Sequence, residues 1–205
     1  MDKIKTQNDE NRKSYNNISE QWINNRKKSE LNNLVIDFSK KIKHGGRILD
    51  IGCGTGYPIA KYFSDNGFIV TGIDISEKLL QEAIDQHIKN ANFYLCDFFN
   101  YKPKEKYDGI IAFDSFFHFE KNKQEKIYKI VSEWMEKGSY ILFTHGNIDG
   151  EITGEMYGET FYYSSLKTER VHELLKKSNI EIELSIEKYK EKDMDRDLVI
   201  IGRKE

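Results

Sequence analysis

The sequence predicts an α/β fold, in which a mostly parallel sheet carries helices on both faces and an antiparallel strand pair closes the chain. Short apolar segments of strand length alternate with segments whose apolar residues recur at helical spacing. The early strand segments are apolar throughout, as expected for parallel strands that are buried on both faces. The last two segments alternate polar and apolar residues around a charged turn at 188–196, which predicts an antiparallel pair at the sheet edge.

Length and charge narrow the class of protein. The 205 residues suffice for one large α/β domain, and we expect residues 1–205 to form a single domain. A formal net charge of −2 argues against a nucleic-acid-binding protein, which needs an excess of Lys and Arg. The sequence has no apolar run of about 18 residues and begins with a polar segment, so it predicts neither a membrane span nor a signal peptide.

Cysteine and histidine usage indicates no metal site. The two cysteines, Cys53 and Cys96, are expected to be free thiols in a reducing cytosol, which predicts a cytoplasmic protein. The five histidines are scattered along the chain, so no ligand cluster with metal-binding spacing is present.

The order of elements follows from the same periodicity. We expect residues 1–13 to be frayed, and two helices to follow in an N-terminal helical cover at 1–44 that ends at glycines. The predicted strands and helices then alternate, Gly138 ends one helix, Ser165 caps the last one, and a glycine-spaced aromatic insertion at 146–165 lies on the substrate side. The predicted strands are 47–51, 68–74, 93–96, 107–114, 139–145, 180–186 and 198–202.

Residues 47–58 form the central motif. An apolar strand ends in Asp50 and Ile51, and glycines follow at alternate positions, Gly52, Gly54 and Gly56, before Pro58 opens a helical pattern. Glycine permits positive φ, and its missing Cβ lets a ligand approach the backbone. A strand that turns through glycines into a helix is therefore a device for holding a cofactor.

The acidic residues around the motif narrow the choice of cofactor. A nicotinamide site has glycines at G-x-G-x-x-G and a pyrophosphate on the helix, which the carboxylate of Asp50 would repel. That carboxylate suits a cationic group or a ribose hydroxyl. Asp74 ends the second strand, where it could accept hydrogen bonds from ribose hydroxyls, and Asp97 ends the third, where it could accept from an adenine amine.

The stretches Ile48–Gly56, Gly72–Ser76 and Cys96-Asp97 together closely resemble the class I S-adenosylmethionine-dependent methyltransferases. The resemblance covers about residues 45–145 and implies a Rossmann-like, doubly wound seven-stranded sheet. It also implies S-adenosylmethionine as cofactor and S-adenosylhomocysteine as product. The implied cofactor-binding residues are Asp50, Gly52, Cys53, Gly54, Gly56, Asp74, Ile75, Asp97, Phe98 and Asp114. Gly52–Gly56 could also be a plain tight turn, Asp74 a helix cap, and Asp97 a strand end without ligand contact.

Catalytic and acceptor-binding residues are less clearly marked. Methyl transfer needs alignment first, and needs a base only if the nucleophile must lose a proton. Three residues near strand ends are candidates for catalysis, although each could equally be structural: Asp114, His118 and His145. The candidates for contact with the acceptor are Tyr15, Trp22, His118, Tyr157 and Tyr162. The N-terminal helices could either cover a sheet face or close over the site with Tyr15 and Trp22 inward.

We expect a small molecule as acceptor. Amino-methyltransferases that modify nucleic-acid bases carry a proline-rich Asn/Asp-Pro-Pro-aromatic motif after the fourth strand, and here that segment, 112–119, contains no proline. The alternatives are a protein or RNA methyltransferase, or a cofactor-binding module without catalysis; a nicotinamide-dependent oxidoreductase is disfavoured by the glycine spacing. The sequence leaves the acceptor atom open, as well as the choice between monomer and homodimer.

Overall fold

The structure is a computed structural model that describes residues 6–192 and 194–205. Its main sheet has seven strands in the order β3-β2-β1-β4-β5-β9-β8. Strands β1 to β5 pair in parallel, whereas β9 is antiparallel to both β5 and β8. This confirms the predicted Rossmann-like sheet with its antiparallel C-terminal pair. The strand bounds are β1 (Arg47–Ile51), β2 (Ile69–Asp74), β3 (Ala91–Leu95), β4 (Tyr107–Ala112), β5 (Met135–His145), β8 (Ile180–Glu191) and β9 (Met194–Lys204).

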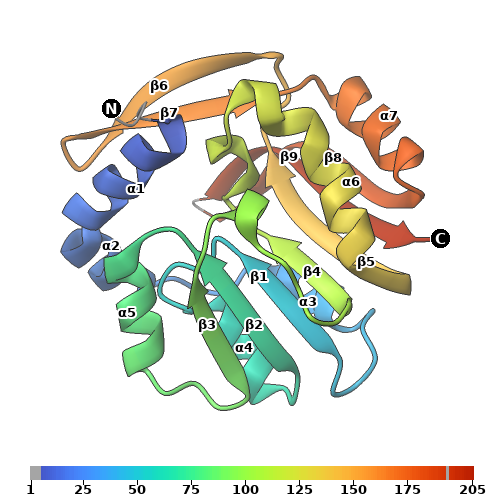
Figure 1. The fold of residues 1–205 in the computed structure, drawn as a ribbon, viewed down its shortest axis with the longest axis horizontal. Helices are drawn as coiled ribbons and strands as arrows, with labels where there is room; N and C mark the ends of the chain where they lie inside the picture. The colour runs from blue at the N-terminus through green and yellow to red at the C-terminus, as the bar shows by residue number, and fades with distance from the viewer. Residues whose placement is uncertain (1–5, 193) are drawn as a thin grey trace.

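Helices cover both faces of this sheet (Figure 1). A cluster of buried apolar side chains lies between the helices and the sheet on each face. On one face, α6 and α7 bury side chains such as Val131 and Leu175. On the other face, α3 and α4 do the same with Phe38 and Phe63. In the described residues, no helix has the length and apolarity needed to cross a membrane. The helices are α1 (Gln7–Asn17), α2 (Ser19–Arg26), α3 (Asn33–Ser39), α4 (Ile59–Asp65), α5 (Glu77–Asp85), α6 (Gln124–Trp134) and α7 (Thr168–Lys177), with short 3₁₀ turns η1 (Phe98–Asn100), η2 (Phe116–His118) and η3 (Lys121–Lys123).

The N-terminal cover differs from the prediction. Helix α1 begins at Gln7, inside the segment that we expected to be frayed; residues 1–5 of that segment lie outside the described part. A capping box explains the early start, because the hydroxyl of Thr6 accepts from Asp9 N (3.1 Å) and the Asp9 carboxylate accepts from Thr6 N (3.3 Å). The N-terminal helices also do not form one unit. Helix α3 packs on the sheet, whereas α1 and α2 lie beside α5 (Figure 1).

The glycine-spaced insertion is a β-hairpin rather than a loop. Strands β6 (Gly150–Met156) and β7 (Glu159–Ser165) pair antiparallel in a separate two-stranded sheet, which passes over α1 in Figure 1. Tyr157 and Gly158 both have positive φ, 52° and 81°, as a two-residue hairpin turn requires. Ser165 therefore ends β7, and the prediction that it caps a helix is wrong: α7 follows Lys167, without a side-chain cap.

Two other boundaries were predicted wrongly. Helix α6 ends at Trp134, and Gly138 lies inside β5 with a φ of 80°, where the pairing with β4 shifts its register. A glycine with positive φ can form a strand bulge as well as a helix end. Here the pairing of β5 with β4 shows that Gly138 belongs to a strand. The charged turn is also much shorter than 188–196, because β8 continues through Glu191 and β9 resumes at Met194.

Gln124, the first residue of α6, joins these parts. Its side chain is fully buried, and its amide nitrogen lies 2.9 Å from Phe116 O, 3.2 Å from Phe119 O and 3.0 Å from Ser164 Oγ. Its amide oxygen lies 2.9 Å from Nε2 of His145. One side chain thus ties the segment after β4 to the hairpin and to the end of β5.

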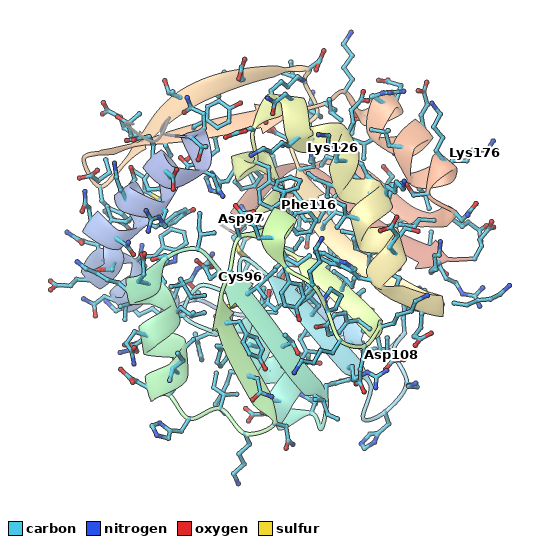
Figure 2. The ribbon with its side chains drawn as sticks, viewed as in Figure 1. Cys96, Asp97, Asp108, Phe116, Lys126 and Lys176 are labelled. Carbon is cyan, nitrogen blue, oxygen red and sulfur yellow. The ribbon has the colours of Figure 1, made fainter. Side chains whose placement is uncertain are left out.

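Replacing Gln124 by Leu should lower the free energy of unfolding by at least about 2 kcal/mol, because it leaves several buried polar groups unsatisfied. Urea denaturation measures the change. The control is Lys126→Ala, two residues along on the exposed side of α6 (Figure 2), which should unfold like the unmodified protein. Equal stability of Gln124→Leu and Lys126→Ala would show that this network does not hold the hairpin.

Candidate cofactor and acceptor site

The glycine loop after β1 is held against β2 by hydrogen bonds. The backbone nitrogens of Gly52 and Cys53 donate to Ile73 O at 2.9 and 3.2 Å. The nitrogen of Gly54 donates to Oδ2 of Asp74 at 2.8 Å. At Gly52, where φ is 76°, a Cβ would lie 2.6 Å from the Cβ of Ser115. The loop therefore needs glycine at this position and cannot shift freely.

A hollow, which we call the loop hollow, lies between this loop, the carboxyl ends of β2 and β4, and the helices α1 and α2. Figure 2 places Cys96 and Phe116 near this end of the sheet, and Asp108 at the opposite end. Most of the predicted cofactor-binding residues line the hollow: Asp50, Gly52, Cys53, Gly54, Asp74, Ile75, Phe98 and Asp114.

Gly56 and Asp97 are the predicted cofactor-binding residues that do not line the hollow. A Cβ on Gly56 would lie only 3.0 Å from Ile88 and 3.1 Å from Phe93, so this glycine permits close packing. Oδ1 of Asp97 caps η1 by accepting from Phe99 N at 2.8 Å, and Oδ2 accepts from the amide of Asn8. Both residues therefore contribute to the packing and hydrogen bonding of the segments around the hollow and do not line it themselves.

The loop hollow concentrates negative charge. The Asp50 side chain is 3% exposed and has no hydrogen-bond partner among the described residues. Burial, together with the charge of Asp74, raises the pKa of Asp50 to about 7. Burial also raises the pKa of Asp74, although Ser76 N and Gly54 N donate to its carboxylate. Opposite them, the guanidinium of Arg26 lies 4.7 Å from the centroid of the Trp22 ring.

A second hollow, the hairpin hollow, opens beside the first between β6–β7 and the β8–β9 turn. Four residues line both hollows: Tyr15, Trp22, Asp114 and His118. Apolar and aromatic side chains line much of the second one, among them Phe117, Ile148, Met156 and Tyr163. A ligand in the hairpin hollow could therefore contact these four side chains together with a ligand in the loop hollow.

Two of the candidate catalytic residues, Asp114 and His145, contact other groups of the protein through their polar side-chain atoms. Asp114 has a φ of 62°, and Arg196 binds both of its carboxylate oxygens, at 2.5 and 2.6 Å. His145 has Nδ1 2.7 Å from Gly146 O and Nε2 2.9 Å from the amide oxygen of Gln124. Burial lowers the pKa of His145 to about 4. These contacts favour structural roles for both residues.

Of the five residues predicted to contact the acceptor, three line the hollows and two do not. Tyr15, Trp22 and His118 lie where the two hollows meet. Tyr157, at the hairpin turn, is 47% exposed and bonds to Asn25, and it lines neither hollow. Tyr162 is buried and also lines neither; its hydroxyl donates to Glu151 at 2.6 Å and thereby holds the hairpin together.

Three residues of the site carry no signal in the sequence. Asn11, which is 1% exposed, donates to Tyr162 O (2.9 Å) and accepts from Tyr162 N (2.8 Å), so that α1 pairs with β7. Arg26 reaches the loop hollow from the end of α2. Ser115 is buried there, and its hydroxyl has no partner among the described residues. All three are ordinary polar residues in unremarkable stretches, and only the tertiary structure brings them together.

Comparison with known proteins identifies the family. The sequence matches the family described as "Methyltransferase domain" over residues 42–194, which is most of the chain. The chain belongs to the class I S-adenosylmethionine-dependent methyltransferases. S-adenosylmethionine is the cofactor of this family, in agreement with the cofactor that the resemblance of the glycine loop and its acids implied.

Individual relatives agree with this assignment at low identity. A malonyl-[acyl-carrier protein] O-methyltransferase of Bacillus cereus is 31% identical over 145 residues, 68% of this chain and 47% of its own. A ubiquinone biosynthesis O-methyltransferase of Rickettsia bellii is 32% identical over 150 residues, 66% of this chain and 62% of its own. The chain thus spans about half the length of these relatives.

The fold agrees as well. The crystal structure of a methyltransferase from Methanosarcina mazei superposes with a TM-score of 0.69 at 20% identity, covering 86% of this chain and 99% of that one. The side chains of this methyltransferase also suit S-adenosylmethionine. The unpaired Asp50 carboxylate and the unpaired Ser115 hydroxyl offer polar partners to a cationic ligand with hydroxyl groups. A Cβ on Gly54 would meet nothing closer than the Trp22 nitrogen at 4.0 Å, so the loop backbone is open to a ligand there.

Replacing Asp50 by Asn should stabilise the protein without ligand at pH 8 but not at pH 4. The folded protein binds a proton on Asp50 up to a pKa of about 7, whereas the unfolded chain loses it near 3.8, so stability falls as pH rises between these values. The gain at pH 8 should be on the order of a few kcal/mol, measured by urea denaturation at each pH.

Asp108→Asn is a control of opposite sign. Burial raises the pKa of Asp108, but its bonds to Lys43 (2.8 Å) and to Arg47 N (2.8 Å) lower it by more. Asp108 therefore stabilises the fold above its unfolded pKa, and Asp108→Asn should be less stable at pH 8. Loss of stability in Asp50→Asn at pH 8 would contradict the account of Asp50 as an unpaired buried carboxylate.

Proposed function

We propose that this protein transfers a methyl group from S-adenosylmethionine to a small-molecule acceptor bound in the hairpin hollow. The observation that carries the proposal is that Tyr15, Trp22, Asp114 and His118 line both hollows. Donor and acceptor would thus meet at this junction, and holding two reactants in contact is the main requirement of methyl transfer. The names of the relatives, one of which acts in ubiquinone biosynthesis, support an acceptor from small-molecule metabolism.

Residues of the loop hollow would hold the cofactor in defined orientation. Asp50 pairs with the ammonium group of its methionine part, where a cation relieves the cost of the buried carboxylate. Asp74 accepts from the ribose hydroxyls with lone pairs that Gly54 N and Ser76 N leave free. Gly54, where the space for a Cβ is open, would let the ligand approach the loop backbone, and Phe98 and Ile75 would pack beside the adenine. When bound, S-adenosylmethionine supplies an electrophilic methyl group on a sulfonium centre.

Side-chain contacts attach the helices α1 and α2, which line this junction, to α5. Arg12 on α1 pairs with Glu77 at 2.5 Å, and Lys27 after α2 pairs with Glu82 at 3.0 Å, so both helices are fastened to α5. Asn16 of α1 also accepts from the Ser76 hydroxyl at 2.7 Å. Because exposed ion pairs are weak, these contacts can break to admit ligands and re-form around them.

The proposal is tested in two steps that separate an enzyme from a binding module. Calorimetry with S-adenosylhomocysteine, and with NAD as control, first measures whether the loop hollow binds the expected cofactor. Incubation with methyl-labelled S-adenosylmethionine and three separate acceptor fractions (metabolites, proteins and RNA) then shows where the label goes. Label in the metabolite fraction supports the proposal. Label confined to protein or RNA, or cofactor binding without any transfer, would refute it.

Met156→Trp should block the acceptor without disturbing the cofactor. Met156 lines the hairpin hollow and not the loop hollow, so a larger side chain there fills acceptor space alone. We expect the rate of label transfer to fall at least about ten-fold. The Kd for S-adenosylhomocysteine should stay within about three-fold, a difference of less than 1 kcal/mol. Full transfer activity in this variant would place the acceptor elsewhere.

A further inference from the structure

The neighbours of His118 determine which of its two ring nitrogens carries the proton. His118 is 8% exposed at the end of η2, with Nδ1 3.1 Å from the backbone oxygen of Tyr162 and Nε2 2.8 Å from the hydroxyl of Tyr15. Nδ1 faces two groups, the carbonyl oxygen of Tyr162, which can only accept a hydrogen bond, and Nδ2 of Asn11 at 3.2 Å, which can only donate one. We assign the ring proton to Nδ1, because the carbonyl is the nearer of the two and the hydrogens of Asn11 have carbonyl partners of their own. Nε2 then carries a lone pair, and the hydroxyl of Tyr15 donates to it.

Asn11 makes this arrangement rigid. Its amide nitrogen lies 2.9 Å from Tyr162 O, 3.2 Å from His118 Nδ1 and 3.4 Å from His118 O. With the ring proton on Nδ1, the two amide hydrogens go to the two carbonyl oxygens. Its oxygen accepts from Tyr162 N at 2.8 Å. The carbonyl that fixes the His118 tautomer is thus itself fixed. Burial lowers the pKa of His118 to about 4, although the facing carboxylate of Asp114 and the Tyr162 carbonyl oppose the shift, so the imidazole is neutral at pH 7.

Tyr15 connects this imidazole to both hollows. Its ring packs edge-on against Trp22 and Phe161, with centroids 5.5 and 4.8 Å apart, which sets the position of the hydroxyl. Because the hydroxyl donates its only proton to His118, its oxygen can still accept a hydrogen bond, and no other partner among the described residues takes that place. A ligand group at the junction can therefore donate to Tyr15.

Three other ionisable side chains at the hairpin hollow, Asp114, His145 and Tyr163, are less suited to take a proton. Arg196 binds both carboxylate oxygens of Asp114. Both nitrogens of His145 face oxygen atoms of the protein. Tyr163, whose ring centroid lies 4.9 Å from that of His118, is a phenol whose pKa is raised by burial, so it keeps its own proton. The Tyr15–His118 pair offers a neutral imidazole connected to the ligand space through one hydroxyl.

We propose that Tyr15 and His118 act together as the general base of the reaction and that the acceptor is a hydroxyl compound, such as a phenol or an enol. The acceptor hydroxyl gives its proton to Tyr15 Oη while Tyr15 passes its own proton to His118 Nε2. The electron pair left on the acceptor oxygen forms the bond to the methyl carbon, and the pair of the broken carbon–sulfur bond stays on sulfur. The imidazolium returns its proton to water after the product leaves.

The presence of a base is what indicates a hydroxyl. A carboxylic acid is already ionised at pH 7, and a neutral amine attacks through its own lone pair, so neither needs a base to uncover its nucleophile. A thiol, with a pKa of about 8.5, holds its proton less tightly than a phenol. A phenol, with a pKa near about 10, keeps its proton at pH 7 and needs a base to react. The inference rests on the proposed function, since it assigns the acceptor class of the same site.

Two variants remove the two members of the pair with little change of shape. Tyr15→Phe keeps the packed ring and removes the hydroxyl, and His118→Asn keeps a donor near Tyr162 O and removes Nε2. The control is Tyr128→Phe, which deletes a buried hydroxyl that has no partner among the described residues and belongs to a core residue that lines neither hollow. Thermal unfolding and calorimetry with S-adenosylhomocysteine establish for each variant that the fold and the loop hollow are intact.

The test uses S-adenosylmethionine with a ¹³C-labelled methyl group and a metabolite extract. Carbon–proton correlation spectra distinguish methyl groups on oxygen, nitrogen and sulfur. We expect O-methyl ethers as products, and an at least about 100-fold lower rate in Tyr15→Phe and His118→Asn but not in Tyr128→Phe.

The outcomes separate this inference from the proposed function. Methylation of nitrogen or sulfur, or variants as fast as the control, would overturn the inference and leave the methyltransferase assignment standing. Failure to bind S-adenosylhomocysteine would refute the proposed function itself. Binding without transfer to any acceptor would refute both the enzymatic function and the base.

Discussion

The carboxylate of Asp74 is the contact on which the rest of the site depends, because it fastens the glycine loop to the end of β2. It accepts from Gly54 N and Ser76 N at 2.8 Å each, so one side chain sets the loop on one side and the start of α5 on the other. The loop then presents its backbone to an open hollow and leaves Asp50 buried without a partner. A buried, unpaired carboxylate lowers stability, and a cationic ligand compensates for it.

The cover over this hollow is built from polar side chains rather than from strand pairing. Asn11 binds the backbone of Tyr162 as a neighbouring strand would, and Asn16 binds the hydroxyl of Ser76. Helix α1 therefore bridges the hairpin and α5, two elements that are far apart in the chain. This bridge places Tyr15 at the junction of the two hollows, so the same helix that encloses the cofactor also shapes the contact with the acceptor.

The sequence predicted those parts of the fold that depend on neighbouring residues. The apolar strand and alternate glycines at 48–56 predicted the loop, and strand acids such as Asp74 predicted its surroundings. Gly138 and Ser165 were interpreted wrongly, because a glycine or serine alone does not distinguish a helix end from a strand feature. The partner of Asp97 is 89 positions away, and the partner of Asn11 is 151 positions away, so no local pattern could show either contact.

A crystal structure with S-adenosylhomocysteine tests the central claim most directly, namely that the loop hollow is the cofactor site. The account predicts the ligand between the glycine loop and α1–α2, with its ammonium group against Asp50 and its ribose hydroxyls on Asp74. Tyr15 and His118 should then face the open end of its thioether. A ligand bound elsewhere, or one whose ammonium and ribose do not contact these two carboxylates, would contradict the account.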